Sequence, residues 1–225
     1  MAGTQIDTIL FDLDGTICDY RRDGADILDI AFEQVGVEPC FSLSDYIDRL
    51  DTLEYKASTF AARREQCFVS LAREAGLDTE TGQELVRVYA TERDQTNVEF
   101  CPGGERALRS LKEDHALGLV TNGGPDIQPA KLSALGIEDW FDTIVYAGYE
   151  TAAKPDPEPF EHALTTLDST SDRSVHIGNS LAADVAGAQR AGLTSVWIDN
   201  GADPVPEPDF AIDSLADLAE PPWYR

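Results

Sequence analysis

The sequence has few lysines, no closely spaced cysteine pair and no long hydrophobic run. Its apolar stretches fall well short of the roughly 18 residues that indicate a membrane span. The first residues, Met-Ala-Gly-Thr-Gln, lack the basic and apolar regions of an export signal. The four cysteines form no Cys-x-x-Cys pair, which argues against zinc and thioredoxin patterns. These absences predict a reduced, cytoplasmic protein that has no membrane partner.

Positive charge is also scarce. The chain carries 17 Lys and Arg against 42 Asp and Glu, a net charge of −25. Such a surface repels nucleic acid, so no nucleic-acid partner is expected. The acidic residues are dispersed and aromatics make up 8% of the chain, which indicates a folded protein rather than a disordered one. Because the Debye length falls to about 3 Å in 1 M salt and removes self-repulsion, we predict a halophilic protein.

The 225 residues are enough for one large domain or two small ones. A strand is predicted over residues 4–13. No β-branched run follows between about residues 20 and 97, where apolar residues recur at helical spacing instead. The helices expected in this region span residues 25–35, 43–53, 59–75 and 81–96.

Strands return after residue 97 and alternate with helices. Further strands are expected at residues 116–120, 143–147, 174–177, 194–198 and 210–212. The helices between them are expected at residues 105–113, 126–135, 157–167 and 182–191. This alternation predicts an α/β fold, with a Rossmann-like, doubly wound parallel sheet and an inserted all-α cap. The predicted core domain comprises residues 1–19 and 98–225, and the cap comprises residues 20–97.

Two carboxylates stand at the end of the first predicted strand, in the hexapeptide Phe-Asp-Leu-Asp-Gly-Thr. Asp12 and Asp14 are two residues apart, and Gly15 allows a sharp turn after them. The carboxyl ends of strands are where ligands bind in open α/β sheets. Because two close anions repel each other, the pair implies either a hard cation such as Mg²⁺ or two carboxyl groups with separated pKa values.

Polar residues also follow three other predicted strands. They are Thr121, Asn122 and Gly123 after the second strand, Lys154 before Pro-Asp-Pro after the third, and Gly178, Asn179, Ser180 and Asp184 after the fourth. In a parallel sheet these strand ends lie along one edge, so the four segments are expected to converge on one pocket.

Together these four motifs resemble the haloacid dehalogenase superfamily of aspartate-nucleophile hydrolases, and the resemblance extends over the whole chain. The helical block after the first motif looks like the C1-type cap of that family. The resemblance implies a Mg²⁺-dependent phosphomonoesterase that acts on a small soluble phosphate ester through an aspartyl-phosphate. It also implies that Asp12 is the nucleophile and that Asp14 is the general acid and base.

The resemblance assigns the remaining residues of the site by motif. The catalytic residues would be Asp12, Asp14, Thr121 and Lys154. The phosphate-binding residues would be Asp12, Gly15, Thr121, Asn122 and Lys154. The Mg²⁺ ligands would be Asp12, the Asp14 carbonyl, Asn179 and Asp184. The three histidines have no motif partner and are interpreted as packing or surface residues.

Asn179 departs from the phosphatase pattern, in which an aspartate follows the glycine. A neutral amide oxygen is a weaker ligand for a hard cation than a carboxylate, so the metal site is expected to be weaker or rebuilt around Asp184. Asn at this position resembles the metal-independent 2-haloacid dehalogenases, but those have Tyr where this chain has Asp14. A phosphomutase and a noncatalytic binding protein are further alternatives. In each case the protein is expected to be a monomer or a homodimer.

Overall fold

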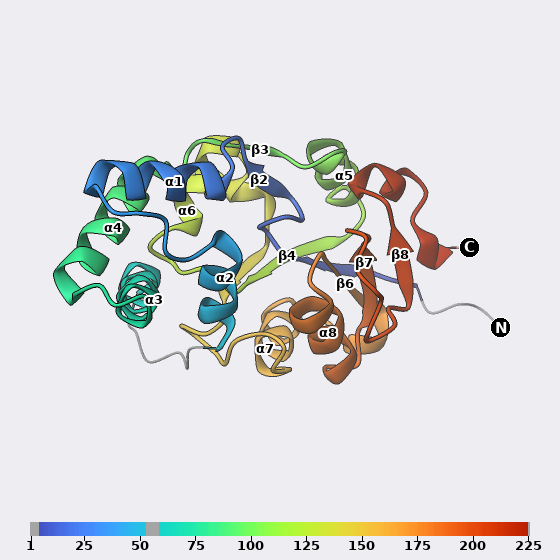
Figure 1. The fold of residues 1–225 in the computed structure, drawn as a ribbon. Helices are drawn as coiled ribbons and strands as arrows, with labels where there is room; N and C mark the ends of the chain where they lie inside the picture. Colours follow the sequence, from blue (N-terminus) through green and yellow to red (C-terminus); the bar gives the residue numbers. More distant parts are fainter. Residues whose placement is uncertain (1–4, 53–58, 225) are drawn as a thin grey trace. The chain divides into compact units, whose positions relative to one another are not determined.

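The computed structural model describes residues 5–52 and 59–224, and the chain divides into two units (Figure 1). The first unit consists of Met1–Asp19, Val98–Gly124 and Leu135–Arg225, and the second of Tyr20–Asn97 and Pro125–Ala134. Residues 125–134, which the sequence pattern groups with the sheet domain, therefore belong by their contacts to the second unit. Thr4 and Leu53, at the ends of a predicted strand and a predicted helix, lie outside the described residues.

The first unit is built on a six-stranded sheet in the order β5-β4-β1-β6-β7-β8. Every neighbouring pair of strands in it is parallel. The strands are β1 (Thr8–Phe11), β4 (Ala116–Thr121), β5 (Thr143–Tyr146), β6 (Ser174–Gly178), β7 (Thr194–Ile198) and β8 (Phe210–Ile212). This arrangement confirms the predicted α/β fold class.

Helices cover both faces of this sheet, as Figure 1 shows. They are α5 (Gly104–Leu111) on one face, and α7 (Glu158–Thr166) and α8 (Ala186–Arg190) on the other. All four residues of β1 are buried, as expected for a central parallel strand with an apolar sequence. Leu10 of β1 packs in one buried cluster with Phe160 of α7 and Ala188 of α8. The burial of this cluster holds β1 and its carboxyl end in place.

The second unit is helical and has its own core. Its helices are α1 (Gly24–Val35), α2 (Leu43–Thr52), α3 (Phe60–Glu74), α4 (Thr79–Glu92) and most of α6 (Gln128–Leu135). Phe68 lies at the centre of the core, with the rings of Phe41, Tyr46 and Tyr89 at centroid distances of 5.4, 5.1 and 5.1 Å. Offset and edge-on aromatic pairs of this kind add to the stabilisation that burial provides.

Side-chain caps mark the starts of three of these helices, namely Asp23, Thr59 and Asp78. Asp126 explains why the loop before α6 groups with this unit. Its carboxylate accepts hydrogen bonds from the backbone N–H groups of Phe60 and Ala61, each at 3.1 Å, at the N-terminus of α3. A negative charge is favourable at that end of a helix.

Two short strands were not expected from the sequence. β2 (Cys18–Tyr20) and β3 (Val98–Phe100) form a separate two-stranded sheet at two of the points where the chain changes unit, after Asp19 and before Val98. The segment after β6 also differs from prediction, because it begins with a π-helical turn, Leu181–Val185, before α8 continues it.

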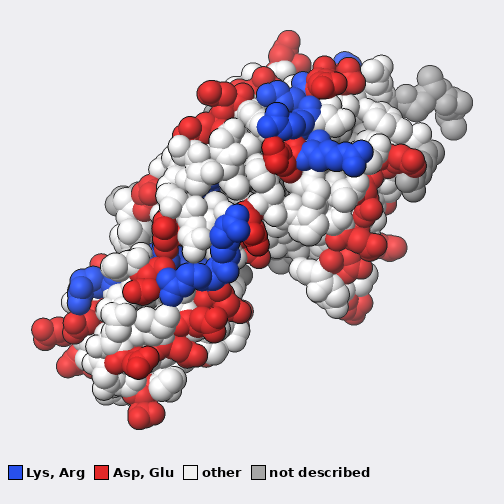
Figure 2. Space-filling model, turned by 90° about the horizontal axis from the view of Figure 1, so that it is seen from above, with Lys and Arg blue, Asp and Glu red and all other residues white. Residues whose placement is uncertain are grey.

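Acidic side chains are dispersed over the face in Figure 2, where lysine and arginine side chains gather in only a few places. The picture agrees with the net charge of −25. Among the described helices, none combines the length and the apolar character that crossing a bilayer would require.

Candidate active site

Three of the predicted site residues lie at the carboxyl ends of three adjacent strands. Asp12 follows β1, Thr121 ends β4 and Asn179 follows β6, and β1 lies between the other two strands. From β1 the sheet continues in one direction through β4 and β5 and in the other through β6, β7 and β8. In open α/β sheets, ligands bind at the carboxyl ends of the strands where the strand order reverses in this way. The Asp12 N–H donates to the Ile177 carbonyl at 2.9 Å, which ties the start of the loop to β6.

The buried Lys154 ammonium is the centre of the site. Its Nζ donates to Asp12 Oδ1 at 2.8 Å and to Asp184 Oδ1 at 2.7 Å. A third hydrogen bond goes to the Val120 carbonyl at 2.7 Å. The side chain of Lys154 is 2% exposed and that of Asp12 is 11% exposed. All three N–H groups of the ammonium are therefore used, and its position is well determined.

The Lys154 ammonium contacts two carboxylates, and their pKa values shift in opposite directions. Burial opposes ionisation of Asp184, but the Lys154 ammonium and the His176 N–H outweigh it and lower the pKa of Asp184. Burial raises the pKa of Asp12 to about 7, with Lys154 acting in the opposite direction and the charges of Asp184 and Asp14 adding to the rise. The two carboxylates in turn raise the pKa of Lys154 despite its burial. Asp184 is thus the ionised partner, and Asp12 is the carboxyl group that binds a proton more readily.

Asn122 anchors the main chain of Lys154. Its side-chain Nδ2 donates to the Lys154 carbonyl at 3.1 Å, and its Oδ1 accepts from the Lys154 N–H at 2.9 Å. The Asn122 side chain is therefore engaged with the protein, and only its backbone could serve the predicted phosphate site. Thr121 is buried, and its Oγ1 accepts from the Gly123 N–H at 3.1 Å, which shapes the turn after β4.

Asp184 is held by protein groups on both of its oxygens. Besides Lys154, Oδ1 accepts from His176 Nε2 at 3.0 Å, and Oδ2 accepts from the Ser180 N–H at 3.0 Å. The π-helical turn directs this side chain back over its own N-terminus. A Cβ atom at Gly178 would lie 2.3 Å from the Asp184 carboxyl carbon, so only glycine allows this approach.

An oxygen-lined position lies on the other side of Asp12. Thr16 Oγ1 is 3.4 Å from both Asp12 Oδ2 and Asn179 Oδ1, so a carboxylate and an amide oxygen flank the same hydroxyl. Gly15 has φ +73°, and a Cβ atom there would lie 2.4 Å from Asn179 Nδ2. The Asn179 carbonyl accepts from Trp197 Nε1 at 3.0 Å, which fixes the backbone at this point.

These oxygen atoms are suitable ligands for a hard cation, which they would bind with modest affinity. Mg²⁺ prefers oxygen ligands and is commonly held by one or two carboxylates together with waters and substrate phosphate. Residues 5–52 and 59–224 contain no group of three or more His, Cys, Asp or Glu side chains that could hold a metal. Any cation here would rest on Asp12 Oδ2, Asn179 Oδ1 and the backbone of the Asp14 loop.

The sequence motifs did not reveal three residues of the site. Thr16, although part of the first motif, was given no role, and Ser180 was not expected to bind Asp184. His176 was interpreted as a packing or surface residue, yet it contacts Asp184. Its position in an apolar strand gave no signal, because contact with Asp184, eight residues later, depends on the π-helical turn Leu181–Val185.

Comparison with known proteins identifies the family of the chain. The model of the haloacid dehalogenase-like hydrolase family matches residues 9–198. The phosphoserine phosphatase of Thermus thermophilus is 32% identical over 170 residues, which is 74% of this chain and 68% of that protein. The magnesium-bound putative hydrolase YfnB of Bacillus subtilis superposes with a TM-score of 0.78 at 24% identity, covering 95% of this chain and 97% of that one. A 2-haloacid dehalogenase from Pseudomonas syringae has a TM-score of 0.67 at 26% identity, with coverage of 96% and 97%.

Proposed function

Because the chain belongs to the haloacid dehalogenase-like hydrolases and is a phosphatase among them, we propose that it is a Mg²⁺-dependent phosphomonoesterase for a small soluble phosphate ester. The proposed reaction proceeds through an aspartyl-phosphate on Asp12.

The buried Lys154 ammonium beside Asp12 is the observation that carries the proposal. A carboxylate that attacks a phosphate dianion meets strong repulsion unless a cation lies next to both groups. Lys154 Nζ is 2.8 Å from Asp12 Oδ1 in a site that excludes most water, where its charge acts strongly. In the proposed reaction the Thr121 hydroxyl and the backbone N–H groups of the turn after β4 also bind phosphoryl oxygens.

Proton transfer falls to Asp14. In the proposed reaction Asp12 attacks phosphorus, Asp14 donates a proton to the leaving alkoxide, and Asp14 then accepts a proton from the water that hydrolyses the aspartyl-phosphate. Asp14 is half-buried in the loop after β1, and its charge acts on Asp12. In this proposal the two carboxyl groups divide the roles of nucleophile and acid.

Asp12, Asn179 and the Asp14 backbone are the groups proposed to hold Mg²⁺. When bound, the ion would neutralise negative charge on the phosphoryl group and on Asp12. We assign Asp184 to Lys154 instead, because both of its oxygens already accept hydrogen bonds from the protein.

The second candidate, a 2-haloacid dehalogenase, is favoured by Asn179 and by the likeness to a dehalogenase of Pseudomonas syringae. Asp14 argues against it, because a departing halide needs no proton and an alkoxide does. Release of chloride from 2-chloropropionate in the presence of EDTA would favour the dehalogenase.

The proposed setting is a cytoplasm with high salt. The dispersed acidic surface supports the salt requirement, and the four free cysteines are compatible with a reducing compartment. Whether the protein is a monomer or a homodimer stays a prediction.

The proposal is tested by hydrolysis of p-nitrophenyl phosphate in molar KCl, with Mg²⁺ or with EDTA, by the wild type and Asp12→Asn. We expect Mg²⁺-dependent turnover that the substitution abolishes. Asp114→Asn removes an exposed carboxylate of the same unit and is the matched control, expected to keep full activity. Equal activity with EDTA, or in Asp12→Asn, would contradict the mechanism.

A further inference from the structure

His176 is a buried histidine that contacts the network around Lys154. It lies on β6 with its side chain 1% exposed, and Nε2 is 3.0 Å from Asp184 Oδ1. The same oxygen accepts a hydrogen bond from Lys154 Nζ at 2.7 Å. Lys154 and His176 therefore both donate to one carboxylate oxygen of Asp184, and Lys154 also donates to Asp12.

The ring of His176 is neutral and donates through Nε2. Burial lowers the pKa of His176, and the opposing influence of Asp184 does not overcome it. Because Nε2 faces an ionised carboxylate, the one proton of the neutral ring must lie on that nitrogen. In the described part of the chain Nδ1 makes no hydrogen bond of good geometry, and the nearby Leu10 carbonyl has only a small influence that raises the pKa of the ring. The ionised Asp184 carboxylate is the stronger of the two acceptors, so we expect the tautomer with its proton on Nε2.

From this geometry we propose that His176 is a positioning residue, which acts through Asp184 to hold the Lys154 ammonium beside Asp12. The proposal rests on the proposed function for its catalytic consequence, but the positioning itself is a property of the unliganded protein. Asp184 has a second anchor in the Ser180 N–H, on Oδ2. The His176 N–H is the bond that orients Oδ1, the oxygen that faces Lys154.

Packing alone is the competing explanation for His176. The Phe160 ring meets it edge-on, with centroids 4.8 Å apart and the planes at 83°. A side chain that only fills space would be replaceable by any group of similar size, whereas a positioning residue needs a donor at the place of Nε2. Glutamine and asparagine separate the two cases, because the Gln amide nitrogen reaches the position of Nε2 and the Asn amide nitrogen that of Nδ1.

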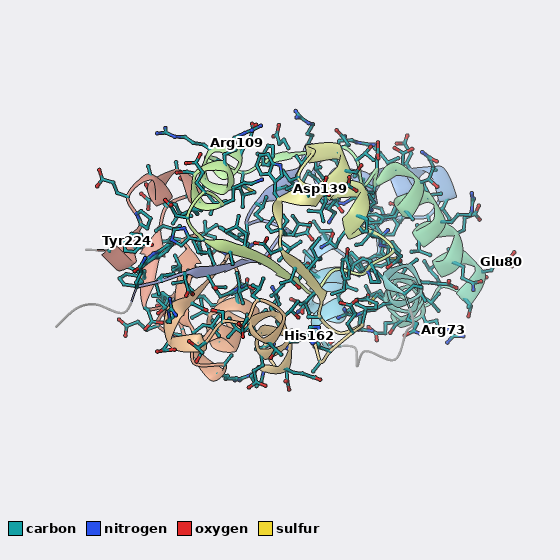
Figure 3. The ribbon with its side chains drawn as sticks, turned by 180° about the vertical axis from the view of Figure 1, so that it is seen from behind. Arg73, Glu80, Arg109, Asp139, His162 and Tyr224 are labelled. Carbon is teal, nitrogen blue, oxygen red and sulfur yellow. The ribbon has the colours of Figure 1, made fainter. Side chains whose placement is uncertain are left out.

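Nuclear magnetic resonance of the ¹⁵N-labelled wild-type protein tests the tautomer without any substitution. The chain has three histidines, so the imidazole region is simple. His162 is exposed on α7 (Figure 3), and His115 contacts Tyr224, so the buried ring is readily distinguished. We expect a neutral His176 with its proton on Nε2 in metal-free buffer at pH 7.5. A proton on Nδ1 alone, or on both nitrogens, would overturn the proposal.

The Lys154 ammonium provides the second readout. Only four lysines are present, and the Lys154 signal is assigned by its loss in Lys154→Met. In His176→Asn we expect this signal to shift and to exchange faster with water, whereas His176→Gln should keep it near its wild-type position. Phe160→Leu removes the ring contact but not the N–H donor, and should also leave it unchanged. An unchanged Lys154 signal in His176→Asn would refute the positioning role.

Steady-state kinetics with p-nitrophenyl phosphate give the catalytic consequence. Loss of a hydrogen bond to a charged group predicts that kcat falls about tenfold to a hundredfold in His176→Asn. KM should change little, because His176 does not contact substrate. His176→Gln should recover most of kcat, and Phe160→Leu should keep it. Equal losses in Phe160→Leu and His176→Asn would show that packing is the cause. If the wild type hydrolyses no phosphate ester, the proposed function fails, while the resonance experiments still decide the role of His176.

Discussion

Replacing Asp12, the proposed nucleophile, should stabilise the metal-free protein. Asp12 is buried and has a pKa raised to about 7 from 3.8, chiefly by burial. The folded-state pKa exceeds the ordinary value by about 3 units, at about 1.36 kcal/mol each. Ionised Asp12 therefore lowers the unfolding free energy of the wild type by about 4 kcal/mol above pH 7. Asp12→Asn keeps a carbonyl oxygen for Lys154 and removes the ionisation.

The sign of the pH dependence follows from proton binding. Because the pKa of Asp12 is higher in the folded state, the native protein binds more protons between pH 3.8 and about 7. The contribution of Asp12 to wild-type stability therefore falls as pH rises through this range. The advantage of Asp12→Asn over the wild type should thus grow by about 2 kcal/mol between pH 5.5 and pH 8.

Urea denaturation in molar KCl with EDTA measures this difference at the two pH values. Asp114→Asn changes the net charge equally at an exposed position and should show no such growth. Mg²⁺ at pH 8 should stabilise the wild type, by mass action, and leave Asp12→Asn unaffected. The stability difference between Asp12→Asn and the wild type could instead be the same at both pH values. Asp12 would then be fully ionised in the wild type at both, and the raised pKa of Asp12 would be wrong.

Three further predictions concern the cation site and the surface. Asn179→Asp should tighten Mg²⁺ binding in a thermal-shift titration, and an unchanged affinity would remove Asn179 from the ligands. Gly15→Ala should lower the unfolding free energy, measured in urea, by about 1–3 kcal/mol and should weaken Mg²⁺ binding. The reason is that φ is +73° at this position and the new Cβ would collide with the Asn179 side chain. A variant as stable as the wild type would contradict this close approach. The melting temperature should rise steeply between 0.1 and 2 M KCl, since salt screens a net charge of −25, and a flat response would argue against halophilic adaptation.

The sequence was most informative where a motif and a strand coincide. Asp12, Thr121 and Asn179 could be placed at one sheet edge because apolar runs precede them, and strands of a parallel sheet end together. The three-residue strands β2 and β3 gave no periodic signal, because three residues are too few to show alternation. The sequence did not indicate that the loop at Asp126 contacts the helical unit, since its partner is a helix more than sixty residues earlier.

Side-chain roles were predictable only where chemistry restricts them strongly. A lysine before Pro-Asp-Pro pointed to the active site, but the fact that its main chain is held by Asn122 did not follow from the motif. Asp184 resembled a metal ligand by spacing, and the motif did not indicate that the π-helical turn brings its carboxylate to Lys154 and Ser180. Such assignments depend on the direction in which each side chain points and on its hydrogen-bond partners, which a sequence motif does not show.

The hydrogen bonds of Lys154 also determine how the proposed reaction must begin. The ammonium has three N–H groups, and Asp12, Asp184 and the Val120 carbonyl occupy all of them. A phosphoryl oxygen can therefore reach Lys154 only by replacing one acceptor. The Val120 carbonyl belongs to β4 and Asp184 is held at both oxygens, so Asp12 is the acceptor that can turn away. That movement frees an N–H group for phosphate and releases the nucleophile from its ion pair in one step. An Asp184 held firmly by His176 and Ser180 then keeps the ammonium in place while Asp12 moves.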